Sequence, residues 1–181
     1  MNTPRRTSTY DAIVIGGGQA GPSLAARLVA AGKRVALIER RRLGGTCVND
    51  GCMPTKTLVA SARAAHIARR AADFGVRIDG TVSVDMKVVK ARKDAVVGQS
   101  VANLTQWLGG LRERLRLVHG HARFVGPHAV AVENSATGGA WGETADGEVL
   151  EAPLIFINTG GRALLPDWPG IADVPVLTNS S

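Results

Sequence analysis

The apolar residues of this 181-residue chain fall first into short uninterrupted runs. Such runs occupy residues 11–15, 35–38 and 154–157, and they are typical of strands that are buried on both faces. Between the first two runs, residues 23–31 have the spacing of an amphipathic helix, and Gly32 follows it as a typical helix end. A strand, a helix and a second strand within about 30 residues predict a parallel βαβ unit.

The middle of the chain predicts two long helices. Residues 54–72 are rich in alanine with few helix breakers, and Pro54 suits a first turn, where its missing N–H would be unpaired anyway. After a turn, residues 85–114 predict a second helix. Its apolar residues follow in steps of four and three and form one stripe, made of Val97, Val101, Leu104, Leu108, Leu111 and Leu115. We expect a helical hairpin whose alanine-rich arm packs closely against this stripe.

The last third of the chain is rich in short strand-like segments. They are separated by turns that carry Gly or Asn, and they lie at residues 117–118, 123–125, 130–132 and 149–150. The chain as a whole then divides into a flexible leader over residues 1–9, a domain over residues 10–165 and an extended, proline-bearing linker over residues 166–181.

Composition and charge limit the partners that we expect. The net charge is +7, but Lys and Arg are interleaved with Asp and Glu, and no aromatic-plus-basic module is recognisable. We therefore expect a solvated basic surface and no nucleic-acid binding. No stretch reaches the about 18 consecutive apolar residues that a membrane span needs, and no apolar signal core precedes the first strand. The default expectation is a cytoplasmic protein without membrane contact.

A glycine fingerprint connects the first strand to the first helix. Gly16, Gly18 and Gly21 have the spacing GxGxxG, in which the glycines allow a tight turn, backbone contact with a pyrophosphate and close packing of the helix. Glu39 ends the second strand, where it can accept hydrogen bonds from an adenosine ribose; a solvated loop carboxylate is the alternative. The fingerprint predicts an adenine dinucleotide ligand without distinguishing FAD from NAD.

Two cysteines, Cys47 and Cys52, form a C-x4-C pair. Zinc would require further ligands, and the four scattered histidines lack ligand spacing to the pair, so we expect no metal centre. A structural disulfide over so short a loop would remove little entropy from the unfolded chain. Redox chemistry fits better, because Gly51 lets the sulfurs approach and Cys52 opens a helix whose N–H groups stabilise a thiolate. Lys56, one turn later, adds positive charge on the same face.

The segment from residue 44 to residue 56, Gly44-Gly45-Thr46-Cys47-Val48-Asn49-Asp50-Gly51-Cys52-Met53-Pro54-Thr55-Lys56, resembles a known redox motif. It is that of the class I pyridine nucleotide–disulfide oxidoreductases, which include dihydrolipoamide dehydrogenase, glutathione reductase and mercuric reductase. The resemblance continues through Gly120-His121-Ala122 and Thr159-Gly160, and a few positions lean toward the mercuric reductase-like branch. It implies an α/β fold: a Rossmann-like FAD-binding domain with a parallel sheet, a long helical hairpin and a small antiparallel β-meander.

The resemblance also implies residue roles. Cys47 would be the interchange thiol that meets the substrate, Cys52 the charge-transfer thiol against the flavin, and Lys56 a neighbour of the flavin N5 edge. The residues that would hold FAD are Gly16, Gly18, Gln19, Ala20, Gly21, Glu39, Gly45, Thr46, Lys56, His121, Ala122, Thr159 and Gly160.

A flavoprotein oxidoreductase is the activity that follows from these roles. NAD(P)H would reduce FAD, electrons would pass to the Cys47–Cys52 disulfide, and the dithiol would reduce a small-molecule disulfide or Hg(II). No second GxGxxG is present, so we expect an N-terminal piece of a longer homodimeric enzyme, with residues 166–181 leading to an NAD(P)-binding domain. The alternative is an isolated FAD- or nucleotide-binding module without catalytic turnover, and we expect the piece alone to be inactive.

Three positions depart from the family pattern. Asp50 stands where a small apolar residue is common, and a carboxylate pointing at the thiols would raise their pKa. We expect Asp50 to face solvent. Asn158 and Gly161 replace a more usual Ala and Ser beside Thr159-Gly160.

Overall fold

The short apolar runs of the sequence form a five-stranded parallel sheet in the computed structural model, which describes residues 6–134 and 142–180. The sheet has the order β7-β4-β3-β2-β9, and its strands are β2 (Ala12–Ile15), β3 (Val35–Glu39), β4 (Leu115–His119), β7 (Glu143–Thr144) and β9 (Leu154–Ile157). β2 pairs with β3 on one side and with β9 on the other, so the strand order changes direction at β2. Ligands bind at such reversal points, outside the carboxyl ends of the strands.

A second, four-stranded sheet covers one face of the first. Its order is β1-β8-β6-β5, made of β1 (Thr7–Thr9), β8 (Val149–Glu151), β6 (Ala129–Glu133) and β5 (His121–Gly126). β5, β6 and β8 are antiparallel neighbours, whereas β1 runs parallel to β8. Between the two sheets, alternate strand residues meet in one apolar core that includes Ile13, Ile38, Val118, Val132 and Leu150.

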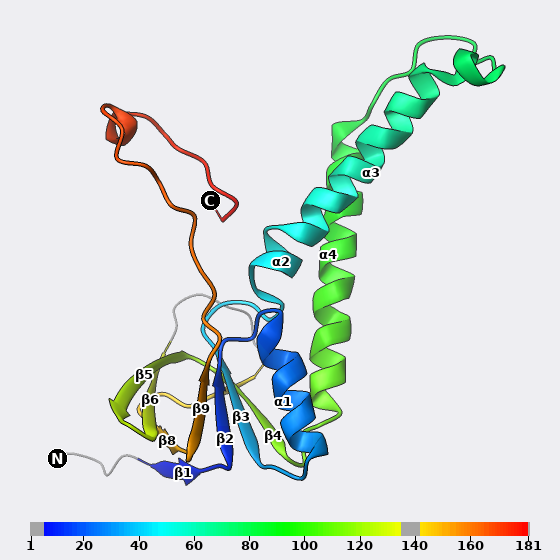
Figure 1. Ribbon diagram of the computed structural model, residues 1–181. Helices are drawn as coiled ribbons and strands as arrows, with labels where there is room; N and C mark the ends of the chain where they lie inside the picture. Colours follow the sequence, from blue (N-terminus) through cyan, green and yellow to red (C-terminus); the bar gives the residue numbers. More distant parts are fainter. Residues whose placement is uncertain (1–5, 135–141, 181) are drawn as a thin grey trace.

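Helices cover the opposite face of the parallel sheet (Figure 1). Val14, Leu37 and Leu115 point to this side and pack with α1 (Ala20–Ala30) and with the end of α4 (Met86–Gly109) in a second apolar core. The result is three layers, sheet on sheet on helix, as expected for an α/β domain with amphipathic faces. The fold class expected from the sequence is confirmed, including the Rossmann-like parallel sheet and the antiparallel strands.

A long helical hairpin projects away from the sheets (Figure 1). Its arms are α3 (Cys52–Arg69) and α4, and a short 3₁₀ helix, η1 (Ala71–Phe74), follows α3. Asp85 caps α4 by accepting hydrogen bonds from the backbone N–H groups of Lys87 and Val88. The short helix α2 (Gly45–Asn49) precedes α3 at the base of the hairpin. Neither long helix, nor any other helix within residues 6–134 and 142–180, is both long and apolar enough to cross a membrane.

The apolar stripe of α4 packs differently from its prediction. Leu104, Leu108 and Leu111 lie in the core formed by the parallel sheet and α1, and Leu115 has left the helix to begin β4. Only the earlier part of α4 is therefore free to face α3. There, Arg92 donates to the backbone carbonyl of Thr57 over 3.0 Å and ties the two arms together.

The ends of the chain also differ from their predictions. Within the expected leader, Thr7–Thr9 form strand β1, because their backbone pairs with β8 although they contain no apolar run; residues 1–5 lie outside the described residues. The tail expected as an extended linker contains a 3₁₀ helix, η2 (Ile171–Asp173), and turns back toward α2 (Figure 1).

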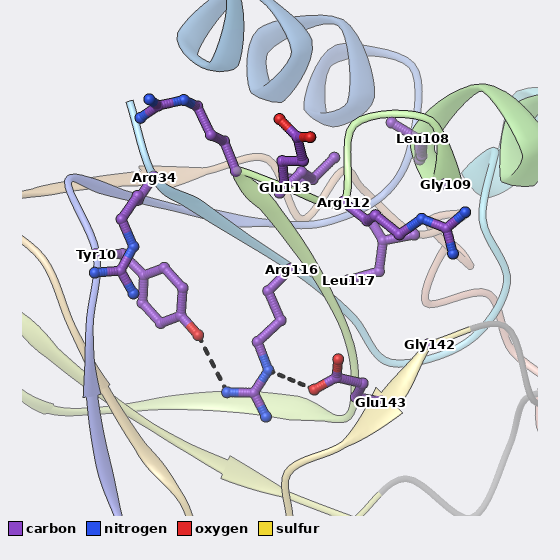
Figure 2. Close-up of a pocket in the computed structure, with 12 residues that line it drawn as sticks. Tyr10, Arg34, Leu108, Gly109, Arg112, Glu113, Arg116, Leu117, Gly142 and Glu143 are labelled. Carbon is purple, nitrogen blue, oxygen red and sulfur yellow. Dashed lines mark hydrogen bonds and ion pairs between the residues drawn. The ribbon is translucent and has the colours of Figure 1, made fainter. Parts of the chain in front are cut away.

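A polar junction joins the two sheets through Arg116 on β4. Its guanidinium donates to both carboxylate oxygens of Glu148 at 2.8 and 3.0 Å and to the Tyr10 hydroxyl at 3.1 Å. Glu143 accepts from the same guanidinium at 2.8 Å, and Figure 2 shows Tyr10, Arg116 and Glu143 beside a cavity of about 610 Å³. The Ser8 hydroxyl donates to Glu148 at 2.6 Å. Hydrogen bonding from Arg116, supported by Ser8, holds the pKa of the nearly buried Glu148 below its ordinary value.

Candidate functional site

The largest concentration of predicted site residues surrounds one cavity of about 1470 Å³ at the carboxyl edge of the parallel sheet. The loops that follow β2, β3 and β9 line it together with α2 and the start of α3. Its volume exceeds the range of about 300–1,000 Å³ that is usual for small-molecule sites, so an extended ligand such as a dinucleotide can be accommodated.

The glycine fingerprint forms a tight turn between β2 and α1. Gly16 has a φ of 111°, and a Cβ there would lie 2.2 Å from the backbone oxygen of Asn158. A Cβ on Gly21 would lie 1.9 Å from the oxygen of Gly16. These two glycines let β9 and α1 approach the turn, whereas Gly18 lines the cavity itself. The division of roles matches the general logic of this fingerprint.

The first turn of α1 faces the cavity. Gln19 and Ala20 line it, and within the described part of the chain no side chain caps the free N–H groups of this helix end. The positive end of the helix dipole therefore points at the cavity and favours an anionic group such as a phosphate.

Glu39 stands at the cavity wall at the end of β3. One carboxylate oxygen accepts from the backbone N–H of Gly17 at 2.8 Å, and the other accepts from that of Arg41 at 2.7 Å. These bonds fix the side chain at the rim. Because each carboxylate oxygen has a second lone pair, Glu39 can still accept hydrogen bonds from a ligand.

The loop before the cysteines passes very close to the fingerprint. Gly45 has a φ of 57°, and a Cβ on it would lie 2.8 Å from the Cα of Gly18. Larger residues would therefore separate the two loops. Both glycines and the neighbouring Thr46 line the cavity.

The two cysteines lie beside each other as free thiols, with Cys47 on α2 and Cys52 at the first position of α3. Both line the cavity, Cys47 half-buried and Cys52 exposed. Hydrogen bonding with the Cys52 side chain raises the pKa of Cys47, burial raises it further, and the charge of Lys56 opposes the increase. Among the described residues no three His, Cys, Asp or Glu side chains are grouped closely enough to hold a metal ion.

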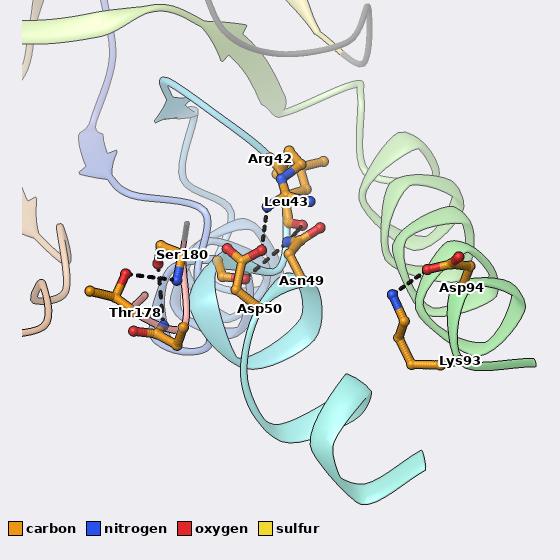
Figure 3. A network of polar contacts seen from close by, with 10 residues as sticks. Arg42, Leu43, Asn49, Asp50, Lys93, Asp94, Thr178 and Ser180 are labelled. Atoms are coloured by element: carbon orange, nitrogen blue, oxygen red, sulfur yellow. Dashed lines mark hydrogen bonds and ion pairs between the residues drawn. The ribbon is translucent and has the colours of Figure 1, made fainter. Parts of the chain in front are cut away.

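The expectation that Asp50 faces solvent is wrong. Its side chain is only 16% exposed, and its carboxylate lies 2.5 Å from the Nη2 atom of Arg42. The loop after β3 places this guanidinium over the turn between the cysteines, so the carboxylate is paired with a cation rather than with water (Figure 3).

Some of the other residues predicted for the site line the cavity, and some do not. Thr159 and Gly160 line it, as does His121 on the far side. Ala122 packs its side chain against the core between the sheets, which leaves only its backbone for a ligand. Lys56 is exposed and lies outside the cavity lining.

Sequence reasoning missed several of the lining residues, and two of them, Arg42 and Asn158, bear on the chemistry of the site. Arg42 belongs to the run Glu39-Arg40-Arg41-Arg42, whose position directly after a strand end was the available signal. Asn158 was noted only as a departure from a pattern. Its side-chain Nδ2 is buried at the cavity wall and, among the described residues, has no hydrogen-bond partner. An unpaired buried donor is costly, so a bound acceptor would relieve it.

These features fit FAD as a ligand. The glycine turn and the open end of α1 suit a pyrophosphate, Glu39 suits a ribose, and the orphaned amide of Asn158 offers a donor on the same wall. The fold and the cavity thus define a dinucleotide-binding α/β domain that carries a pair of adjacent thiols.

Comparison with known proteins supports this class. The family model described as pyridine nucleotide-disulphide oxidoreductase matches residues 10–179. A dihydrolipoyl dehydrogenase of Acholeplasma laidlawii is 32% identical over 166 residues, which are 91% of this chain and 44% of that protein. A mercuric reductase of Bacillus cereus is 33% identical over 176 residues, which are 95% of this chain and 25% of that protein.

A solved structure agrees in fold. The Cu(II) complex of the HOCl-induced flavoprotein disulfide reductase RclA from Escherichia coli superimposes with a TM-score of 0.68 at 32% sequence identity. The match covers 93% of this chain and 32% of that one. This chain belongs to the pyridine nucleotide-disulphide oxidoreductase family. It spans less than half the length of the relatives that it matches.

Proposed function

We propose that this chain supplies the FAD-binding and dithiol part of an NAD(P)H-dependent flavoprotein oxidoreductase that reduces a disulfide or Hg(II). One observation carries the proposal. Cys47 and Cys52 line the same cavity as the dinucleotide fingerprint and Glu39, so a cofactor held by the fingerprint would extend toward the thiols.

In this proposal the chain's own groups divide the work of holding FAD. The N–H groups at the start of α1, around Gln19 and Ala20, receive the pyrophosphate, and the carboxylate of Glu39 receives the ribose hydroxyls. Thr46, Thr159 and the amide of Asn158 contact the remainder of the cofactor. When bound, FAD supplies two-electron transfer between NAD(P)H and the cysteine pair.

The dithiol reduces its acceptor by exchange. The thiolate of Cys47 attacks one sulfur of a substrate disulfide, and the first substrate thiol leaves with a proton. Cys52 then attacks the mixed disulfide at Cys47, which releases the second thiol and leaves a Cys47–Cys52 bond. Two electrons and two protons pass to the substrate. The mercuric reductase among the relatives makes Hg(II) the second candidate acceptor.

A nucleotide-binding module without turnover is the competing function, because the chain spans only part of its relatives. The two functions differ in whether electrons move between the thiols and the flavin. The test is to load the purified chain with FAD, remove free cofactor, and add excess dithiothreitol without oxygen. The proposal expects the flavin absorbance to bleach in the parent chain and to persist in Cys52→Ser.

The outcomes separate the functions clearly. FAD retention with equal bleaching in the parent and in Cys52→Ser contradicts electron transfer through the pair, and bleaching in neither supports the module without turnover. Failure to retain FAD contradicts the proposal and leaves only a module that binds another nucleotide.

The affinity of the site for FAD gives a second reading. Asn158→Ala removes the orphaned donor, and we expect its dissociation constant for FAD to rise about fivefold, since a hydrogen bond of this kind contributes about 1 kcal/mol. Fluorescence quenching of added FAD measures it. An unchanged constant would exclude Asn158 as a contact, and FMN, which lacks the adenosine half, is the matched ligand control.

A further inference from the structure

An ion pair lies immediately beside the two cysteines. Arg42, in the loop after β3, approaches Asp50, which stands between Cys47 and Cys52 in the turn that joins α2 to α3. Figure 3 shows the guanidinium and the carboxylate facing each other above α2. All four residues line the cavity described above.

The turn gives Asp50 little freedom to move away. Its backbone N–H donates to the carbonyl of Thr46 at 2.9 Å. The side-chain amide of Asn49 donates to the carbonyls of Leu43 and Gly45, both at 2.9 Å, and so ties α2 to the loop that carries Arg42. The carboxylate is therefore held on the turn between the two cysteines, paired with Arg42.

The charge of Asp50 has a defined effect on a neighbouring thiol. A carboxylate disfavours a nearby thiolate, because like charges repel, and so raises the pKa of the thiol. The shift reaches about one unit or more when an unpaired like charge lies within about 6 Å. A paired guanidinium brings the local net charge close to zero and removes most of this effect.

Other charged groups around the turn do not replace Arg42. From α3, Lys56 lowers the pKa of Cys47, but it is exposed. From α4, which packs on α2, Lys93 pairs with Asp94. Glu39 is bound to backbone N–H groups at the cavity rim.

Further charged groups line the same cavity. They are Arg40 and Arg41 on the loop, together with His121 and Glu133 across the cavity. Among the ion pairs between described residues, the one that involves Asp50 is with Arg42.

We propose that Arg42 is a positioning residue that shields the cysteine pair from the carboxylate of Asp50. It holds the carboxylate in an ion pair and keeps the turn close to neutral, so that the thiols can ionise for exchange. The inference rests on the proposed redox role of Cys47 and Cys52, and it explains how an acidic residue is tolerated between them.

Single and double substitutions of Arg42 and Asp50 test the inference on the reduced chain without cofactor. Iodoacetamide alkylation of each cysteine is followed by mass spectrometry across a range of pH, which gives the rate constant and the thiol pKa. Arg42→Gln leaves the carboxylate unpaired, so the pKa rises and the alkylation rate at neutral pH falls about threefold to tenfold, since one pKa unit is tenfold in thiolate. Asp50→Asn leaves the guanidinium unpaired, so the pKa falls.

The double variant Arg42→Gln/Asp50→Asn removes both charges and should return to within about twofold of the parent, because the net charge of the turn is unchanged. Arg42→Lys keeps the charge and should also resemble the parent. Arg70→Gln is the matched control, because it breaks another arginine–aspartate pair, with Asp73 at 2.8 Å, beyond the far end of α3. It should leave both thiols unchanged.

Two results overturn the inference. One is an Arg42→Gln chain whose thiol pKa values equal those of the parent. The other is a double variant as slow as Arg42→Gln, which would mean that Arg42 acts by packing and not by charge. If circular dichroism shows that Arg42→Gln is unfolded, Asp50→Asn decides, since an unchanged pKa there also overturns shielding. Flavin does not enter this assay, so its result is independent of the bleaching experiment.

Discussion

Two arginine–carboxylate pairs occur toward opposite ends of the parallel strands, and they differ in their surroundings. The pair of Arg116 and Glu148 joins the two sheets, with side chains 17% and 6% exposed, and further hydrogen bonds surround it. The pair of Arg42 and Asp50 lies at the rim of the cavity, with its guanidinium 47% exposed.

Because of this difference in exposure, we expect the first pair to stabilise the fold and the second pair to act mainly on function. When one partner of a buried pair is lost, the other charge remains without compensation in a poorly solvated place, which is strongly destabilising. When Asp50 is lost from the second pair, water solvates the guanidinium of Arg42, whose side chain is 47% exposed, and the fold changes little. The same chemistry therefore stabilises the fold at Arg116, whereas at Arg42 its main effect is on the neighbouring thiols.

The largest expected effect follows from breaking the buried pair. Glu148→Gln should lower the free energy of unfolding by about 3 kcal/mol, because the Arg116 charge loses its main partner. Urea denaturation followed by circular dichroism measures it. Glu143→Gln is the matched control, since Glu143 binds the same guanidinium with a side chain 69% exposed, and it should cost less than about 1 kcal/mol. Equal losses in the two variants would contradict the role assigned to burial.

The pH dependence of stability tests the buried pair in a second way. Since the folded-state pKa of Glu148 lies below its ordinary value of 4.5, the carboxylate contributes stability above that pH. The contribution disappears as the pH falls through the folded-state pKa. The stability difference between the parent and Glu148→Gln should thus shrink below about pH 4.5, measured by urea denaturation at each pH. A difference that stays constant down to acid pH would show that the Glu148 charge is not its source.

The smallest effect is expected at the cavity rim. Asp50→Asn should change the free energy of unfolding by about 0.5 kcal/mol or less, because the arginine that it leaves unpaired has a side chain 47% exposed to water. The same urea titration measures it, beside the alkylation assay on the same sample. A loss above about 2 kcal/mol would place this pair in the structural class of Arg116 and remove the contrast.

The local elements were predictable because their signals are local. The βαβ unit, the two long helices and the strands β5, β6, β8 and β9 follow from apolar runs and helical spacing, with ends that moved by a few residues. The C-terminal half of the α4 stripe was assigned to the wrong neighbour, because periodicity reports a buried face and not what covers it.

For the candidate site, the fingerprint and the cysteine motif single out residues that the fold brings to one cavity. Gly18, Glu39, Thr46, Cys47 and Cys52 line one cavity, although they come from several separate loops. Their roles stay predictions. The solvent-facing position expected for Asp50 was wrong, because its partner lies in a different loop and no pattern near Asp50 encodes it.

The sequence by itself determined the βαβ unit, the two long helices and the glycine turn, and it predicts redox chemistry for Cys47 and Cys52, since residues close along the chain carry that information. Long-range packing determined the rest. β1 becomes a strand only because β8 lies beside it, and Ser8 meets Glu148 across 140 residues of chain. Arg42 likewise meets Asp50 only once β3, its following loop and α2 are assembled. Such contacts depend on how the layers stack, so they appear only in three dimensions.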